Sequence, residues 1–229
     1  MVEKNTKKLS ASFEENIRYM NETLPVKESF DMIRRDMEIG GKASVFYYID
    51  GFIKDEAMLK IMDSFLSVSV EDMPGDAEGF LQKKVPYVEV DLLEDFDQVI
   101  RNVLSGTACL FIDGYKECIC IDCRTYPARS VDEPDKDKSL RGSRDGFVET
   151  IVFNTALMRR RIRDPHLVME MTEAGQTSRT DIAICYMQDR VDRALLDNLK
   201  KRIESLQVGD LRMNQQSLAE SLFKRKWYN

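Results

Sequence analysis

Five cysteines and one histidine are the residues of this 229-residue chain best suited to bind a metal or act as nucleophiles. Cys120 and Cys123 have the spacing of half a zinc knuckle, but no second pair follows them, and Cys109 and Cys185 stand apart in the sequence. In a strand, Cys118 and Cys120 share a face while Cys123 points away. Because structural zinc requires four convergent ligands, we predict no metal site and no cofactor.

Catalytic signatures are equally hard to find. The chain contains neither of the two common glycine-rich phosphate-binding motifs. The single histidine, His166, follows Pro165 at the start of an expected strand, where a surface or packing role is favoured over that of a general base. Turn chemistry explains the acidic residues Asp50 and Asp113, since each precedes a glycine. The sequence therefore predicts no catalytic residues and no enzyme activity.

Residues 122–143 combine charges of both signs with two prolines, Pro127 and Pro134, and we call residues 127–143 the charged segment. Arginine and carboxylate side chains form forked ion pairs, which add specificity to a contact. Four residues are the candidates for such contacts: Arg129, Glu133, Arg141 and Arg144. Composition leaves two interpretations open, a solvated linker or a clamp at an interface.

Helical periodicity dominates the stretch after this segment. Apolar residues recur at helical spacing from Phe147 to Ile162, Ser143 or Asp145 is suited to cap the start, and the arginines of 159–163 suit the carboxyl end. The pattern therefore predicts one long helix.

The remaining elements alternate between helix and strand. Helices are expected over 12–24, 55–67, 76–83, 96–104, 191–206 and 214–224, and strands over 43–49, 107–112, 115–121 and 167–171. Residues 28–39 are ambiguous, with a short helix leading into an extended stretch, and a further extended piece is expected near 207–212. Because residues 181–187 are almost continuously apolar, they predict a central strand.

This order of elements predicts an α/β fold. We expect two small α/β subdomains, with mixed sheets and helices packed on them, joined by the charged crossover segment. The expected divisions are an N-terminal helix over 1–24, a first subdomain over 25–126, the charged segment over 127–143 and a second subdomain over 144–229.

Composition excludes some partners. Charged residues make up 32% of the chain and the formal net charge is −6, whereas nucleic-acid binding requires a basic surface. No apolar run approaches the roughly 20 residues of a membrane helix, so this part of the chain is expected to be soluble. The odd number of cysteines and the lack of an export signal favour reduced thiols in a cytosolic compartment.

Residues 124–163 resemble the N-terminal domain of the GerA-type spore germination proteins, which are the A subunits of germinant receptors. The resemblance rests on R-x-x-P-x-R-S-x-x-E-P at 124–134 and R-G-x-x-x-G-F-x-E-x-x-x-x-N-x-x-L-x-R-R-R-I at 141–162. Further similar stretches lie at 12–20, 47–59 and 178–187. The amino-acid sequence from Arg144 to Leu167 is most similar to the branch of stage V sporulation protein AF.

The resemblance implies a non-enzymatic domain on the spore-core side of the inner spore membrane. It implies homo-oligomers of the full-length protein, other germination membrane proteins as partners, and an ion-conducting complex that promotes germination. Family members continue into a membrane domain, and Lys224, Arg225 and Lys226 suit a cytoplasmic flank of it. The alternative is a small-molecule sensor that binds its ligand in a cleft between the two subdomains.

Overall fold

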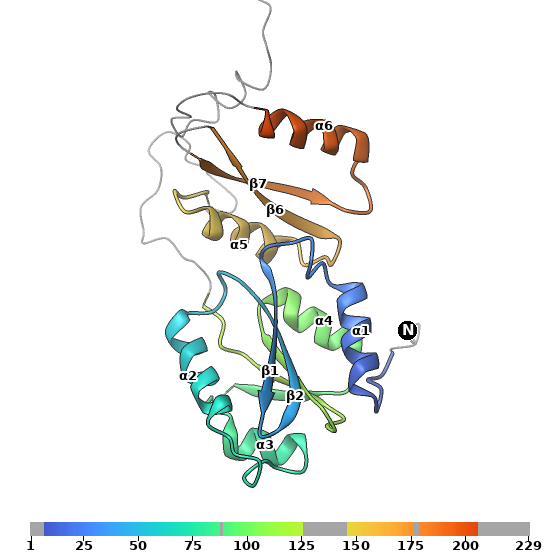
Figure 1. The fold of residues 1–229 in the computed structure, drawn as a ribbon, viewed down its shortest axis with the longest axis vertical. Coiled ribbons are helices and arrows are strands. Elements are labelled where there is room, and N and C mark those ends of the chain that lie inside the picture. Colours follow the sequence, from blue (N-terminus) through green and yellow to red (C-terminus); the bar gives the residue numbers. More distant parts are fainter. Residues whose placement is uncertain (1–6, 88, 126–145, 176–178, 206–229) are drawn as a thin grey trace, which may run out of the picture. The chain divides into compact units, whose positions relative to one another are not determined.

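The computed structural model describes residues 7–87, 89–125, 146–175 and 179–205 (Figure 1). The chain divides into two compact units, Met1–Pro165 and His166–Asn229. In the described ranges, the first unit holds five helices and a five-stranded sheet, and the second holds a two-stranded sheet and one helix. The α/β class is thus confirmed, although both sheets are antiparallel throughout, where mixed sheets were expected.

The sheet of the first unit has the strand order β1-β2-β4-β5-β3. The strands are β1 (Met32–Ile39), β2 (Lys42–Ile49), β3 (Val90–Leu93), β4 (Ala108–Ile112) and β5 (Cys118–Ile121). The expected hairpin at Asp113-Gly114 joins β4 to β5, with Gly114 at a φ of 80°. The short helix expected within 28–39 is wrong: β1 pairs with β2 along its whole length, and this ladder overrides the ambiguous local pattern.

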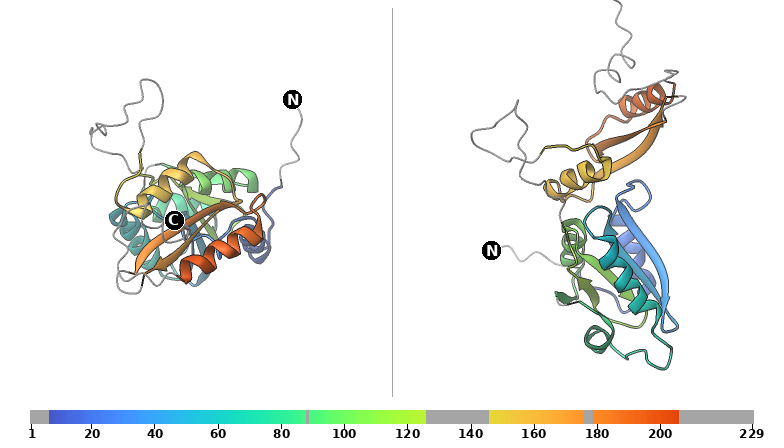
Figure 2. Two further views of the ribbon diagram at one scale, coloured as in Figure 1. Left: turned by 90° about the horizontal axis from the view of Figure 1, so that it is seen from above. Right: turned by 90° about the vertical axis from the view of Figure 1, so that its left-hand side faces the viewer.

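Helices cover both faces of this sheet (Figures 1 and 2). The helices α1 (Phe13–Thr23) and α4 (Phe96–Ser105) pack on one face, and α2 (Asp55–Leu66) and α3 (Ala77–Lys84) pack on the other. Neighbouring residues of a strand point to opposite faces, so Tyr47 joins the core under α1 and α4 while Phe46 joins the core under α2 and α3. Both side chains are fully buried.

Helix α5 (Ile151–Arg161) starts later than the sequence predicts. The Asn154 side chain accepts a hydrogen bond from the Val148 N–H at 2.7 Å and donates one to the Val148 carbonyl at 2.7 Å. Asparagine competes in this way with helical hydrogen bonding, so residues 146–150 stay outside the helix and Phe147 is 61% exposed. The expected start at Ser143 or Asp145 is therefore wrong.

The second unit consists of β6 (Leu167–Ala174), β7 (Thr180–Met187) and α6 (Arg193–Glu204). Helix α6 packs on the sheet through Leu196 and Ile203, and the Glu170 side chain accepts hydrogen bonds from Tyr186 and Lys200. The strand expected over 181–187 is confirmed as β7, which pairs with β6 among the described strands. Its expected central position stays a prediction, because the extended piece expected near 207–212 lies outside these strands.

None of the helices in the described ranges combines the length and apolar character needed to cross a membrane. The extended piece expected near 207–212 and the helix expected over 214–224 lie outside the described residues.

Candidate functional site

The four residues expected to make interface contacts, Arg129, Glu133, Arg141 and Arg144, lie outside the described residues. Their contacts remain a prediction. Both flanks of the charged segment are described, up to Thr125 on one side and from Gly146 on the other. The contacts of these flanks show how the chain is anchored on either side of the charged segment.

The first flank is fixed by Arg124. Its Nε donates to Asp122 Oδ1 at 2.6 Å, and its Nη1 donates to the carbonyl and the Oγ of Ser105 at 3.2 and 3.1 Å. Since Ser105 is the last residue of α4, the guanidinium lies at the negative end of that helix, which favours a cation. The hydrogen bond from Arg124 also lowers the pKa of Asp122. One residue further on, the Thr125 N–H donates to the Phe52 carbonyl at 2.6 Å.

The second flank is fixed by a buried ion pair at the end of α5. Arg159 is fully buried, and its Nε and Nη2 donate to the two carboxylate oxygens of Asp31 at 2.8 and 3.1 Å. Ser29 Oγ donates to the same carboxylate at 2.5 Å, and Arg159 Nη1 donates to the Asp164 carbonyl at 3.1 Å. Such two-pronged pairs combine strength with a defined geometry. We call this group, Ser29, Asp31 and Arg159, the arginine clamp.

Close packing beside the clamp holds the start of α5 as well. Gly51, in the turn after β2, has a φ of 80°. A Cβ atom at this position would lie 3.1 Å from Val152 Cγ1 and 3.2 Å from Ala156 Cβ. The turn thus approaches α5 more closely than most side chains would allow, and glycine also tolerates its left-handed backbone.

A cleft of about 570 Å³ lies between the two flanks of the charged segment. Its lining comprises Asp50, Gly51, Ile53, Lys54, Asp55, Glu56, Thr125, Val152 and Phe153. Thr125 belongs to the first flank, and Val152 and Phe153 belong to α5 on the second. The other residues lie between the end of β2 and the first turn of α2. Three carboxylates against one ammonium group give the cleft a negative character, which suits cationic or amine-bearing groups.

The cysteines converge more than the sequence indicated. Cys118 and Cys120 share a face of β5 as expected, and the Sγ atoms of Cys109, Cys118 and Cys120 all lie within 4.8 Å of one another. The contribution of Cys109 was missed, because it follows from the β4–β5 register, which pairs Cys109 with Cys120. Three thiols are one ligand short of a structural zinc site, and Cys123 lies in the core on the opposite face of the sheet.

Sequence reasoning also missed the arginine clamp. The arginines of 159–163 were assigned together to the end of a helix, and only Arg159 points into the protein interior, while Arg160 and Arg161 are exposed. The partner of Arg159 lies 128 residues away in the sequence. No local pattern marks such a pair, because the buried side of α5 comprises Thr155, Ala156 and Arg159 and differs from the apolar stripe that the sequence predicts.

Comparison with known proteins places these features in a family context. The family model described as "Bacillus/Clostridium GerA spore germination protein" matches residues 18–229. Stage V sporulation protein AF of Bacillus subtilis (strain 168) is 32% identical over 213 residues, which cover 93% of this chain and 43% of that protein. Spore germination protein KA of the same organism is 29% identical over 193 residues, covering 81% of this chain and 35% of that protein.

A solved structure shares the fold. The crystal structure of the N-terminal domain of the A subunit of the Bacillus megaterium spore germinant receptor GerK3 matches with a TM-score of 0.64 and 19% sequence identity. The match covers 89% of this chain and 75% of that chain. The chain spans less than half of the length of the two Bacillus subtilis relatives.

Proposed function

The chain belongs to the GerA family of spore germination proteins, as the motifs at 124–162 predicted, and on this premise we propose that it is the assembly and gating domain of a germination membrane protein. The full-length protein would form homo-oligomers in the inner spore membrane, together with other germination membrane proteins. This domain would lie on the spore-core side and support an ion-conducting complex without enzymatic activity. The regions of the relatives that this chain does not cover would supply the membrane part.

The observation that carries this proposal is the anchoring of both flanks of the charged segment. Arg124 ties the first flank to the end of α4, and the arginine clamp ties α5 to the start of β1. A contact segment that starts and ends on a rigid base loses less conformational entropy on binding, which favours affinity. Because the segment carries both charge signs, it suits a partner whose charges are likewise mixed, such as a second copy of the chain.

The anchoring of α5 also suits gating. Helix α5 ends at Arg161, and four residues later the first unit gives way to the second. The arginine clamp fixes the helix that precedes this junction, so a change at the charged segment would reach the second unit through a rigid element. A rigid element can carry a change from one site to another, which a gating mechanism requires.

Replacing Arg129 or Glu133 with Ala should weaken assembly of the full-length protein. Truncating one partner of a charge pair at an interface costs about 2–5 kcal/mol, so the apparent assembly constant should fall at least tenfold. Cross-linking and analytical ultracentrifugation of detergent-solubilised protein measure this change. The melting temperature of the 229-residue chain should stay unchanged, since substitutions away from buried contacts usually alter stability by less than about 0.5 kcal/mol.

The matched control for these variants is Arg163→Ala, which removes an exposed arginine outside the charged segment. The exchanged pair Arg129→Glu with Glu133→Arg tests whether the two side chains act together, because it restores the opposite charges. If the 229-residue variants instead lose their cooperative melt, the segment serves to hold the chain together and the interface role is wrong. The gating role has a separate test, which is the conductance of the assembled full-length protein in lipid bilayers.

The cleft beside α5 supports a second candidate function, that of a small-molecule sensor. Its volume of about 570 Å³ suits an amino acid or a compound of similar size, and its carboxylates favour an amine-bearing ligand. A ligand at 100 times its dissociation constant stabilises the folded state by about 2.7 kcal/mol. For a chain of this size that should raise the melting temperature by roughly 5–10 °C.

A thermal-shift series with amino acids, sugars, nucleotides and dipicolinate checks the sensor function. The response should be confined to amine-bearing compounds and should weaken in Glu56→Gln, which removes one carboxylate from the lining of the cleft. A flat response across the whole series would count against sensing and leave the assembly function unaffected.

A further inference from the structure

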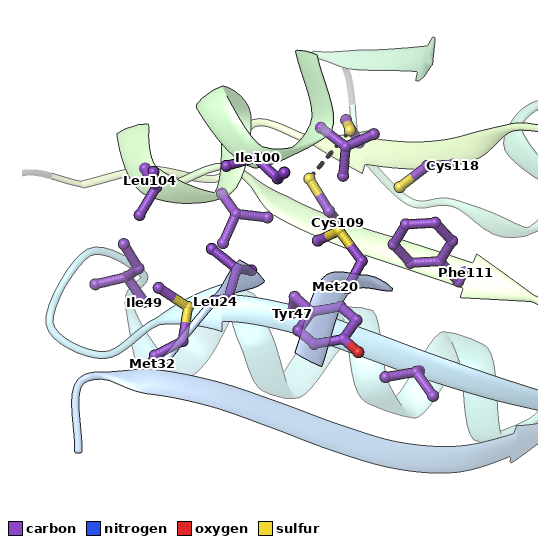
Figure 3. Packing of buried hydrophobic residues seen from close by; sticks show 14 of the residues in the cluster. Met20, Leu24, Met32, Tyr47, Ile49, Ile100, Leu104, Cys109, Phe111 and Cys118 are labelled. Carbon is purple, nitrogen blue, oxygen red and sulfur yellow. Dashed lines mark hydrogen bonds between the residues drawn. The ribbon is translucent and has the colours of Figure 1, made fainter. Parts of the chain in front are cut away.

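The β4–β5 hairpin carries a pair of thiols that lie directly opposite each other in the sheet. Cys109 of β4 pairs with Cys120 of β5 in the strand register, and their Sγ atoms are 3.1 Å apart. Figure 3 shows Cys109 within the hydrophobic cluster, with a dashed line marking its thiol contact. Directly opposite residues of an antiparallel pair have Cα atoms about 4.5–5.5 Å apart, which falls within the range of about 4.4–6.8 Å that disulfides span.

A third thiol lies on the same face of the sheet. Cys118 precedes Cys120 by two residues, and its Sγ lies within 4.8 Å of both other sulfur atoms. All three side chains are buried in the core under α1 and α4, and Figure 3 labels two of them, Cys109 and Cys118. Hydrogen bonds from the Cys109 and Cys118 thiols lower the pKa of Cys120, whereas burial raises the pKa of Cys109 and of Cys118. Cys120 lies directly opposite Cys109 and shares a strand face with Cys118, so we assign it as the nucleophile of the group.

We propose that Cys109 and Cys120 form a reversible oxidation site, at which a peroxide closes a cross-strand disulfide and Cys118 supplies the thiol that exchanges with it. Closing the bond requires the sulfur atoms to approach by about 1 Å, because a disulfide S–S bond measures about 2.05 Å. Rotation of the two side chains supplies a movement of that size while the strand register is kept.

The reaction balances with one peroxide for each disulfide. The Cys120 thiolate attacks one peroxide oxygen, the O–O bond breaks, and the leaving hydroxide takes a proton to become water, which leaves a sulfenic acid on Cys120. The Cys109 sulfur then attacks the Cys120 sulfur and displaces the hydroxyl group, which leaves as a second water with the Cys109 proton. Both sulfurs are oxidised by one electron each and the peroxide is reduced by two. Attack of Cys118 on the disulfide would transfer the bond and free one of the first two thiols.

The surroundings favour a disulfide over a metal. A disulfide is neutral, so it fits the apolar cluster that encloses the three cysteines. Cys123, the nearest further cysteine along the chain, packs in the core on the other face of the sheet and cannot complete a four-ligand site.

Mass spectrometry of the whole chain tests the proposal directly. The native protein is treated with hydrogen peroxide, alkylated to block free thiols, and digested with trypsin without reduction. Cleavage after Arg101, Lys116 and Arg124 places Cys109 in peptide 102–116 and the other thiols of the hairpin region in peptide 117–124. The two peptides should be recovered linked, with the loss of two hydrogen masses, and fragmentation should locate the link at Cys109 and Cys120.

Cysteine variants test which cysteines form the disulfide, and thermal melts test whether it stabilises the chain. The link should persist in Cys123→Ser and Cys185→Ser and disappear in Cys120→Ser. Cys120→Ala serves as a second variant, because alanine adds no polar group to the core if serine impairs folding. A short cross-linked loop stabilises the folded state, so the oxidised wild-type chain should melt on the order of 5 °C higher. Dithiothreitol should reverse both changes.

Two outcomes would overturn the proposal. In the first, peptides 102–116 and 117–124 stay unlinked under native conditions while the half-exposed Cys185 is oxidised. In the second, the link forms only after unfolding, together with random links to Cys123 and Cys185. Both are read from the wild-type chain, so they do not depend on whether a variant folds.

Discussion

Replacing Arg159 with Met should destabilise the first unit by about 3–5 kcal/mol, because it leaves Asp31 buried without its counter-charge. Both side chains are fully buried, so water cannot take over the role of the guanidinium. Methionine keeps most of the apolar volume of the arginine stem, which separates the loss of the charge from the loss of packing. Urea unfolding of the 229-residue chain, followed by circular dichroism, measures the difference in free energy.

A matched control and a double variant make this result specific. Arg163→Met changes an exposed arginine close to the same helix end and should alter stability by less than about 0.5 kcal/mol. Asp31→Leu combined with Arg159→Met removes both charges, and a buried ion pair replaced by apolar residues is often close to neutral. The double variant should therefore recover much of the stability that either single change removes. Simple addition of the two losses would show that Asp31 and Arg159 do not act as a unit.

The arginine clamp also connects stability with the proposed function. Loss of the clamp frees the carboxyl end of α5, the helix that follows the charged segment and precedes the second unit. In the full-length protein, the same variant should impair assembly or gating even where the membrane part keeps the protein inserted. Variants of Arg129 and Glu133 should impair assembly alone. The two classes of variant thus distinguish the role of the residues that anchor the charged segment from the role of the segment's own residues.

Local signals in the sequence were sufficient for most of the fold. The Asp113-Gly114 turn between two apolar runs predicted the β4–β5 hairpin, and helical periodicity predicted α1, α2, α4 and α6 close to their observed bounds. These features depend on residues within a few positions of one another. The family motif at 124–162 likewise predicted the family that the comparisons confirm.

Features that depend on distant residues could not be predicted in this way. Arg159 finds its carboxylate 128 residues away, and Cys109 meets Cys120 only once the strand register is set. The start of α5 was predicted wrongly for a different reason. Asn154 bonds to the backbone of Val148 and keeps residues 146–150 outside the helix, despite the apolar periodicity. The candidate site was therefore located by its charged segment, while the residues that anchor this segment emerged from the structure.

Gly106→Ala should destabilise the first unit by roughly 2–4 kcal/mol through two separate effects. Gly106 ends α4 with a φ of 98°, a left-handed backbone that costs a residue with a side chain about 1 kcal/mol. A Cβ atom there would also lie 2.6 Å from Phe52 Cδ2 and 3.2 Å from Arg124 Cδ. Overpacking of a dense core typically costs about 1–3 kcal/mol, and the fully buried Phe52 has little room to move.

The Gly106 variant tests how the first flank of the charged segment is held. Arg124 bonds to the last residue of α4, and Thr125 bonds to the Phe52 carbonyl, so a shift of Phe52 and Arg124 should loosen this flank. Hydrogen exchange should then rise at the Thr125 amide as well as at the end of α4. Gly75→Ala is the matched control, because a Cβ atom there meets nothing within 4 Å and the change should be neutral or slightly stabilising. Equal stability of the two variants would mean that Phe52 shifts without a loss of folding free energy. The close approach at Gly106 would then not hold the flank in place.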